Sequence, residues 1–247
     1  MCTLTWCSGE HGVHLFFNRD EQRTRPPAEP TARHVRNGVR FLAPIDPQAG
    51  GTWLSVNEHG VAVAILNWYD AEHANPATTA THRSRGLLVM DLAGSLDRAG
   101  SLLARLFGQD LALYRPFILV SLDAHGHGAI CRWDGLQLAA GALTPGDCPL
   151  TTSSFDTAAV IAARRMRYSA MTVNDGPTPE SLAAFHHSRD PRGGPYSVTM
   201  TRPDAMTVSF SHVVIGRNDV RFYDQTRQRT GEDPGYEPVS EAVLART

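Results

Sequence analysis

Residues 1–21 read MCTLTWCSGEHGVHLFFNRDE, and this stretch decides how the rest of the chain is interpreted. Alternation of side chains in residues 3–6, and less regularly in residues 14–16, predicts two strands joined by a turn at residues 8–12. Antiparallel pairing of these strands returns residues 18–21 to the start of the chain. We therefore expect Arg19 to become a neighbour of Cys2, although the two are far apart in the sequence.

Cys2 directly follows Met1 and is the only cysteine that can become an N-terminal residue. Its side chain is small enough that removal of the initiator methionine is expected. Removal places a thiol and a free α-amine on one residue. An α-amine has an ordinary pKa of about 7.7–8.0, so a useful fraction is basic near neutral pH. A nucleophile that carries its own base is the principle of N-terminal nucleophile catalysis. The alternatives are a buried strand cysteine or a chain that retains Met1, in which that base is blocked.

Further motifs accompany this start: NRDE at residues 18–21, GGTWL at residues 50–54, and Asn67 after the next strand. Together they resemble the NRDE family, which includes the transport-and-Golgi-organisation proteins. That family is similar to the choloylglycine hydrolase and penicillin acyltransferase branch of N-terminal nucleophile hydrolases. The resemblance is strong over residues 1–70 and weaker to about residue 225. It implies an α+β fold, a four-layer αββα sandwich of two mostly antiparallel sheets.

Composition restricts the class of protein. The 247 residues, 42% of them hydrophobic, suffice for a large core, and a net charge of −2 favours neither nucleic acid nor an anionic membrane as partner. All 23 basic residues are arginine, which excludes lysine chemistry. No apolar run approaches the roughly 20 residues of a membrane span, and no signal peptide is evident. Four cysteines without disulfide-type spacing indicate a reducing compartment, so a cytoplasmic protein is expected.

We expect one domain over residues 1–247, with a peripheral tail from about residue 225. Three prolines between residues 22 and 40 predict an irregular connector there, with arginines that could face a substrate. Residues 61–67 are apolar on both faces, which predicts a central strand of a covered sheet. Helices are expected over 87–92, over 96–106 with Ser95 as N-cap, after Asp156, and from Pro179. The remaining strands are expected at 41–44, 52–56, 117–123, 129–134, 136–138, 150–154, 196–200, 206–215 and 220–223.

The candidate catalytic residues are Cys2, Arg19, Asp20 and Asn67. A guanidinium at Arg19 would favour the charged form of the thiolate or of a substrate carboxylate. Asp20 would orient the α-amine or accept a hydrogen bond from substrate, or else form a structural pair with Arg19. Adjacent strand residues point to opposite faces, so both can address Cys2 only if the strand bends. The resemblance implies that the amide of Asn67 helps to form an oxyanion hole; strand-end capping is the alternative.

Four further residues are candidate substrate contacts. Asn18 or Glu21 could take the role given to Asp20. Related enzymes place an asparagine about where Thr152 falls, and a hydroxyl is a poorer oxyanion donor. Arg202 could correspond to a late arginine of the family.

No metal site is expected, because His125 and His127 have metal-like spacing but no further ligand nearby. No cofactor motif is present. The leading hypothesis is a thiol hydrolase or acyltransferase that cleaves a non-peptide amide through a Cys2 thioester. The alternative is a non-catalytic carrier of haem, acyl-CoA or lipid, so the expected partner is a small-molecule amide or an amphipathic ligand. The sequence does not determine the oligomeric state.

Overall fold

The first hairpin forms as predicted and lies within a six-stranded antiparallel sheet. This computed structural model describes residues 1–75, 82–229 and 234–247. Strand β1 (Cys2–Gly9) pairs with β2 (Gly12–Gln22) from Cys2 opposite Arg19 to Gly9 opposite Gly12. Gly12 has a φ of 126°, which L side chains rarely adopt, and a Cβ there would overlap the carbonyl of Ile215. Glycine is therefore required where the hairpin turns.

The six-stranded sheet gathers strands from both ends of the chain, in the order β10-β1-β2-β11-β12-β13. All neighbouring strands are antiparallel. The strands besides the first hairpin are β10 (Leu150–Thr152), β11 (Ala205–Ile215), β12 (Asp219–Thr226) and β13 (Ser240–Ala245).

The seven-stranded sheet is built from the middle of the chain, with its strands in sequence order from β3 to β9. It too is antiparallel throughout. Its strands are β3 (Glu29–Arg36), β4 (Val39–Ile45), β5 (Leu54–Asn57), β6 (Val61–Asn67), β7 (Phe117–Asp123), β8 (Gly128–Trp133) and β9 (Leu138–Ala142).

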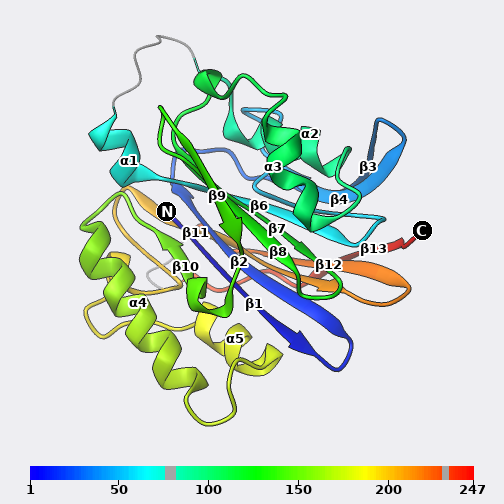
Figure 1. Cartoon of the computed structure of the whole chain (residues 1–247). Helices are drawn as coiled ribbons and strands as arrows, with labels where there is room; N and C mark the ends of the chain where they lie inside the picture. Colours follow the sequence, from blue (N-terminus) through cyan, green and yellow to red (C-terminus); the bar gives the residue numbers. More distant parts are fainter. Residues whose placement is uncertain (76–81, 230–233) are drawn as a thin grey trace.

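Helices cover the outer faces of the two stacked sheets, which gives the predicted αββα sandwich (Figure 1). On the seven-stranded sheet lie α2 (Arg85–Ala93) and α3 (Leu102–Leu106), with α1 (Tyr69–Ala74) following β6. On the six-stranded sheet lie α4 (Thr157–Thr172) and α5 (Pro179–His186). Both begin as predicted, with Asp156 and Thr178 accepting hydrogen bonds from backbone N–H groups. Short 3₁₀ turns are η1 (Ala99–Ser101), η2 (Leu111–Leu113), η3 (Pro145–Asp147) and η4 (Gly194–Tyr196).

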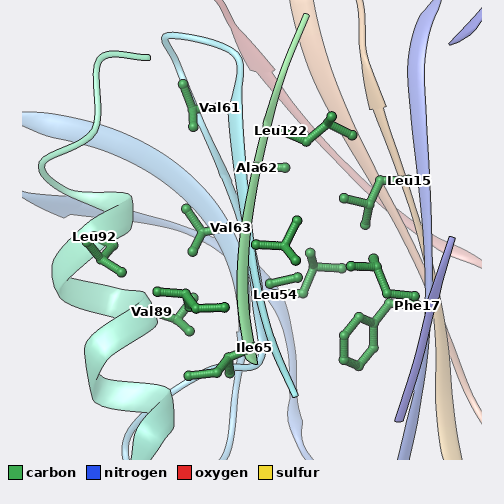
Figure 2. Close-up of a cluster of buried hydrophobic side chains, with 14 of the residues drawn as sticks. Leu15, Phe17, Leu54, Val61, Ala62, Val63, Ile65, Val89, Leu92 and Leu122 are labelled. Carbon is green, nitrogen blue, oxygen red and sulfur yellow. The ribbon is translucent and has the colours of Figure 1, made fainter. Parts of the chain in front are cut away.

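The main core lies between the two sheets and continues under α2. Leu15 and Phe17 of β2 face the seven-stranded sheet, where Ala62 of β6 points toward them (Figure 2). The alternate β6 residues Val63 and Ile65 point instead toward α2. Both faces of β6 are therefore buried, as its uninterrupted apolar sequence predicted.

The expected connector at residues 22–40 contains a strand, and that prediction was wrong. β3 pairs with β4 and is an edge strand of its sheet as the described residues show it. Proline lacks an N–H group and is tolerated on an edge strand. The β3–β4 register shifts between Glu29 and Ala32, on either side of Pro30.

Three other expectations also differ from the structure. The tail is not peripheral throughout, because β13 pairs with β12 and buries Leu244. The strand expected at 196–200 is replaced by η4 and an isolated bridge from Thr201 to Met206. The helix over 96–106 is divided between η1 and α3, and Ser95 donates to the carbonyl of Leu92 rather than capping it. Within the described residues, no helix is long and apolar enough to cross a membrane.

Candidate active site

Cys2 lies between two predicted site residues in the six-stranded sheet. It is directly opposite Arg19 of β2 on one side and Thr152 of β10 on the other. Directly opposed residues of antiparallel strands project on the same face of a sheet. Leu4 and Phe17, on that face of β1 and β2, pack in the core between the sheets. Cys2, Arg19 and Thr152 therefore share the inner face of the sandwich, at the end where a cleft opens.

The cleft has a volume of about 570 Å³ and receives residues from both sheets. Cys2 forms part of its wall and is 9% exposed. Other lining residues from the predicted set are Arg19, Asp20, Glu21 and Asn67. Arg25, one of the arginines of the 22–40 segment that could face a substrate, also lines it. Further lining residues, which the sequence did not single out as site residues, include Asp46, Trp53, Tyr69, Arg85 and Arg115.

Arg19 is held in place by a carboxylate and an aromatic ring. Its Nη2 lies 2.8 Å from Asp46 Oδ2, and its guanidinium lies 4.0 Å from the centre of the Trp53 ring. Asp46 also accepts from Arg25, at 2.7 Å. Burial lowers the pKa of Arg19, whereas Glu21 and Asp46 act in the opposite direction. Arginine remains charged under such conditions, so Arg19 provides a fixed cation beside the thiol.

Asp20 points to the opposite face of the sheet, as strand periodicity predicts. One carboxylate oxygen accepts from Thr207 Oγ1 at 2.6 Å, and the other lies 3.5 Å from Arg164 Nη2. The strand does not bend to bring both side chains onto one face; the irregularity is in β11, where the register shifts between Thr207 and Ser209. Asp20 instead reaches the start of the chain through its backbone N–H, which donates to the Met1 carbonyl at 3.1 Å.

Met1 fills the space next to Cys2. Its α-ammonium donates to the Tyr69 hydroxyl at 3.1 Å, and Asn67 Nδ2 donates to the same hydroxyl at 3.1 Å. Its sulfur accepts from Ser153 Oγ at 2.9 Å and lies 4.0 Å from Arg202 Nη1. Asn67 and Arg202 are thus both close to the N-terminus. While Met1 is present, the nitrogen of Cys2 is an amide and cannot act as a base.

Thr152 contributes an unused hydroxyl to this inner face. It is 4% exposed, and its Oγ1 has no hydrogen-bond partner among the described residues. A buried hydroxyl without a hydrogen-bond partner normally lowers the stability of the fold. Thr152 is paired directly with Cys2, but it is not among the residues that line the cleft.

The four cysteines differ in environment. Burial raises the pKa of the Cys2 thiol, while the N-terminal ammonium opposes this shift. Burial also raises the pKa of Cys7 to about 12 and the pKa values of Cys131 and Cys148 to about 11. None of these three residues lines the cleft.

The two other candidate contacts are placed very differently. Glu21 lies at the cleft, 3.6 Å from Arg19, with 27% of its side chain exposed. Asn18 faces α5 and does not line the cleft. Its amide donates to the carbonyls of His186 and Val198, and its oxygen lies 3.0 Å from His186 Nδ1. Asn18 therefore ties β2 to the helical layer, which differs from the substrate contact expected from the sequence.

Asp46, Tyr69 and Arg164 are among the residues around the site that were not identified from the sequence. Tyr69 follows Asn67 closely, and this spacing at a strand end could have identified it. Arg164 is itself a buried position of α4, next to Ala163, and a charged residue is unusual at such a position. No group of three metal-ligating side chains comes together within residues 1–75, 82–229 and 234–247.

Comparison with known proteins shows the family and the fold of the chain. The family model described as Transport and Golgi organisation 2 matches residues 1–164. The chain belongs to this family. The part that matches includes the Cys2 hairpin, Asn67 and Thr152. No curated protein matches the chain in sequence. The family resemblance predicted from the first 70 residues is confirmed.

Solved structures extend the likeness of this Transport and Golgi organisation 2 family member to the whole fold. A variant of conjugated bile acid hydrolase from Clostridium perfringens is 11% identical, with 100% of this chain and 97% of that chain covered, at a TM-score of 0.63. Penicillin V acylase from Agrobacterium tumefaciens is 13% identical, with 96% and 84% covered, at 0.58. The Caenorhabditis elegans orthologue of N-acylethanolamine-hydrolyzing acid amidase is 12% identical, with 88% and 94% covered, at 0.59. All three are N-terminal nucleophile hydrolases, and the chain shares their fold.

Proposed function

We propose that this protein is a thiol N-terminal nucleophile hydrolase, or an acyltransferase of that type, acting on a small-molecule non-peptide amide. The observation that carries the proposal is the placement of Cys2 in the cleft wall, opposite Arg19 and Thr152 and next to the chain terminus. The structural neighbours are by name hydrolases of bile acid conjugates and acylethanolamines, which supports an amide as the substrate class. The proposal requires that Met1 be removed.

The first half of the reaction forms a thioester. The α-amine of Cys2 accepts the thiol proton, and Sγ attacks the substrate carbonyl carbon to give a tetrahedral oxyanion. The amide C–N bond then breaks. The departing amine takes the proton from the α-ammonium and leaves, and the acyl group remains on Cys2.

The second half regenerates the enzyme. Water, or an acceptor amine in a transferase, attacks the thioester carbonyl while the α-amine removes its proton. The C–S bond breaks, Sγ recovers that proton, and a carboxylic acid or a new amide is released.

The surrounding residues have separate roles in this scheme. Thr152 and Asn67 donate to the oxyanion, Thr152 because its hydroxyl is otherwise unpartnered and Asn67 because it lines the cleft beside Tyr69. Arg19 stabilises the thiolate electrostatically. Glu21, which lines the cleft, and Arg202, which lies beside the Met1 sulfur, contact the substrate. Asp20 acts on the α-amine from the opposite face of the sheet.

Iodoacetamide tests whether Cys2 is the reactive thiol. Alkylation of the native protein, followed by peptide mapping, should modify Cys2 at least about tenfold faster than any other cysteine, because a neighbouring base and a cleft are available only to Cys2. The Cys2→Ser variant is the control and should lose the fast phase alone. Equal labelling of all four cysteines, or slower labelling of Cys2, would contradict the proposed function.

A further inference from the structure

A fully buried ion pair lies directly behind the candidate nucleophile. Arg164 extends from α4 to the outer face of the six-stranded sheet, where its Nη2 is 3.5 Å from Asp20 Oδ2. Neither side chain is exposed to solvent. Arg164 also donates to Thr3 Oγ1 at 2.6 Å and to the Pro195 carbonyl at 3.0 Å. Its position is therefore fixed by β1, β2 and the segment after α5.

Burial of such a pair is costly, and the fold gains little net stability from it. Taking both charges out of water costs several kcal/mol per ion, and a well-packed apolar pair is often as stable or more stable. A second reason for Arg164 follows from the chemistry at Cys2. An α-amine acts as a base only when it is neutral, and an unbalanced carboxylate nearby in a low-dielectric interior would hold it as an ammonium.

Asp20 is close enough to the N-terminus to have this effect. Its N–H donates to the Met1 carbonyl, whose carbon is bonded to the nitrogen of Cys2. Burial lowers the pKa of the N-terminal ammonium, but Tyr69, Cys2 and Asp20 raise it, and the net shift is upward. The pKa of the Asp20 carboxyl is raised by burial and lowered chiefly by Arg164. The guanidinium and the N-terminal ammonium thus act on the same carboxylate.

We propose that Arg164 is a positioning residue that balances the charge of Asp20, so that the α-amine of processed Cys2 is neutral and able to accept a proton near neutral pH. This inference rests on the proposed function. According to this inference, the helical layer takes part in the reaction. The guanidinium of Arg164, on α4, acts on the α-amine through Asp20 and does not contact the substrate.

Other charged or titratable groups also lie around the terminus. Tyr69 bonds to the terminal nitrogen and Arg202 lies beside the Met1 sulfur. Arg19 and Glu21 lie on the cleft side and are paired with each other. Arg85 lines the cleft with Tyr69 and is paired with Glu72. Asp20 also acts to raise the pKa values of the Cys2 thiol and of Tyr236. Among these groups, Arg164 is the cation bonded to Asp20.

The absence of lysine makes the amine directly observable. Reductive methylation with ¹³C-formaldehyde labels only the α-amine, because the sequence contains no other primary amine. A Cys2→Ser background is used, since serine also permits methionine removal and does not trap formaldehyde as cysteine does. The pH dependence of the single ¹³C-methyl resonance then gives the pKa of the terminal amine.

In that background Arg164→Met should raise the amine pKa by about one to three units, because the carboxylate of Asp20 is no longer balanced. Arg165→Met, an equal charge change at an exposed position of the same helix, should shift it by less than about 0.3 unit. Arg164→Lys keeps the charge and should remain near the parent value; its lysine methyl resonance titrates separately near pH 10.

If Arg164→Met fails to fold, two variants still test the inference. Asp20→Asn leaves Arg164 unbalanced and should lower the amine pKa by about one unit or more. The double variant Asp20→Asn with Arg164→Met removes both charges. It should return the pKa of the terminal amine to near the parent value. An amine pKa that is unchanged in every variant would overturn the inference. Detection of Met1 by intact mass in the wild type would instead contradict the proposed function itself.

Discussion

Replacing Cys2 with alanine is expected to lower turnover of an amide substrate by roughly 10⁴-fold or more, because loss of the nucleophile removes the whole thioester route. The thiol lies on the inner face, in the cleft wall, so the change does not disturb the helical layers. The measurement is kcat/KM from release of the free amine, with folding checked by thermal unfolding.

Cys7→Ala is the matched control. Cys7 lies on the same strand but packs with Phe16, Leu182 and Phe210 beneath α5. Its loss should reduce stability modestly and leave kcat/KM within about threefold. Unchanged turnover in Cys2→Ala would contradict the mechanism. A carrier of haem, acyl-CoA or lipid, the alternative function, would show no turnover in either protein and would retain ligand binding without the thiol, unless the sulfur itself binds the ligand.

Replacing Thr152 with valine should lower kcat by roughly 10²–10³-fold, the usual effect of removing one oxyanion donor. Valine has nearly the same shape as threonine, with a methyl group in place of the hydroxyl. Because the Thr152 hydroxyl has no partner within the described residues, its removal should leave the free energy of unfolding unchanged or slightly increased. Loss of activity without loss of stability distinguishes a catalytic hydroxyl from a structural one. The measurements are kcat and denaturant unfolding of the same preparations.

Thr151→Val is the matched control, and it should lose stability while it retains activity. The Thr151 hydroxyl lies 3.2 Å from that of Thr3 on the outer face, so its removal should cost about 1 kcal/mol of stability. Activity should change by less than about threefold. If Thr152→Val retains full kcat, the hydroxyl takes no part in stabilising the oxyanion, and that role would rest with Asn67 and backbone N–H groups.

The sequence predicted the pairing of Arg19 with Cys2 because short-range rules determine it. A tight turn fixed the hairpin register, and the register placed Arg19 opposite Cys2. The period of two residues correctly put Asp20 on the other face. The alternation of side chains along β2 could not predict that Asp20 pairs with Arg164, because Arg164 belongs to a helix that is distant in the sequence. The contact of Asn18 with α5 escaped prediction for the same reason.

Edge strands account for the main errors in the fold. The sequence predicted irregular structure around β3, because of its prolines, and at the end of the chain, because of its charges and prolines. Edge strands tolerate such residues. Long-range pairing with β4 and with β12 makes these segments strands. By contrast, the uninterrupted apolar sequence of β6 predicted a central strand, and β6 is buried on both faces.

The state of the N-terminus tests the account most directly. Intact mass of the purified protein, before and after treatment with a small aldehyde, reports both methionine loss and the presence of thiol and amine on one residue. An aldehyde forms a stable thiazolidine, with loss of water, only with such an aminothiol. We expect a mass lower by one methionine, followed by addition of one aldehyde minus water. A protein that retains Met1 and forms no thiazolidine would contradict the claim that Cys2 is an N-terminal nucleophile.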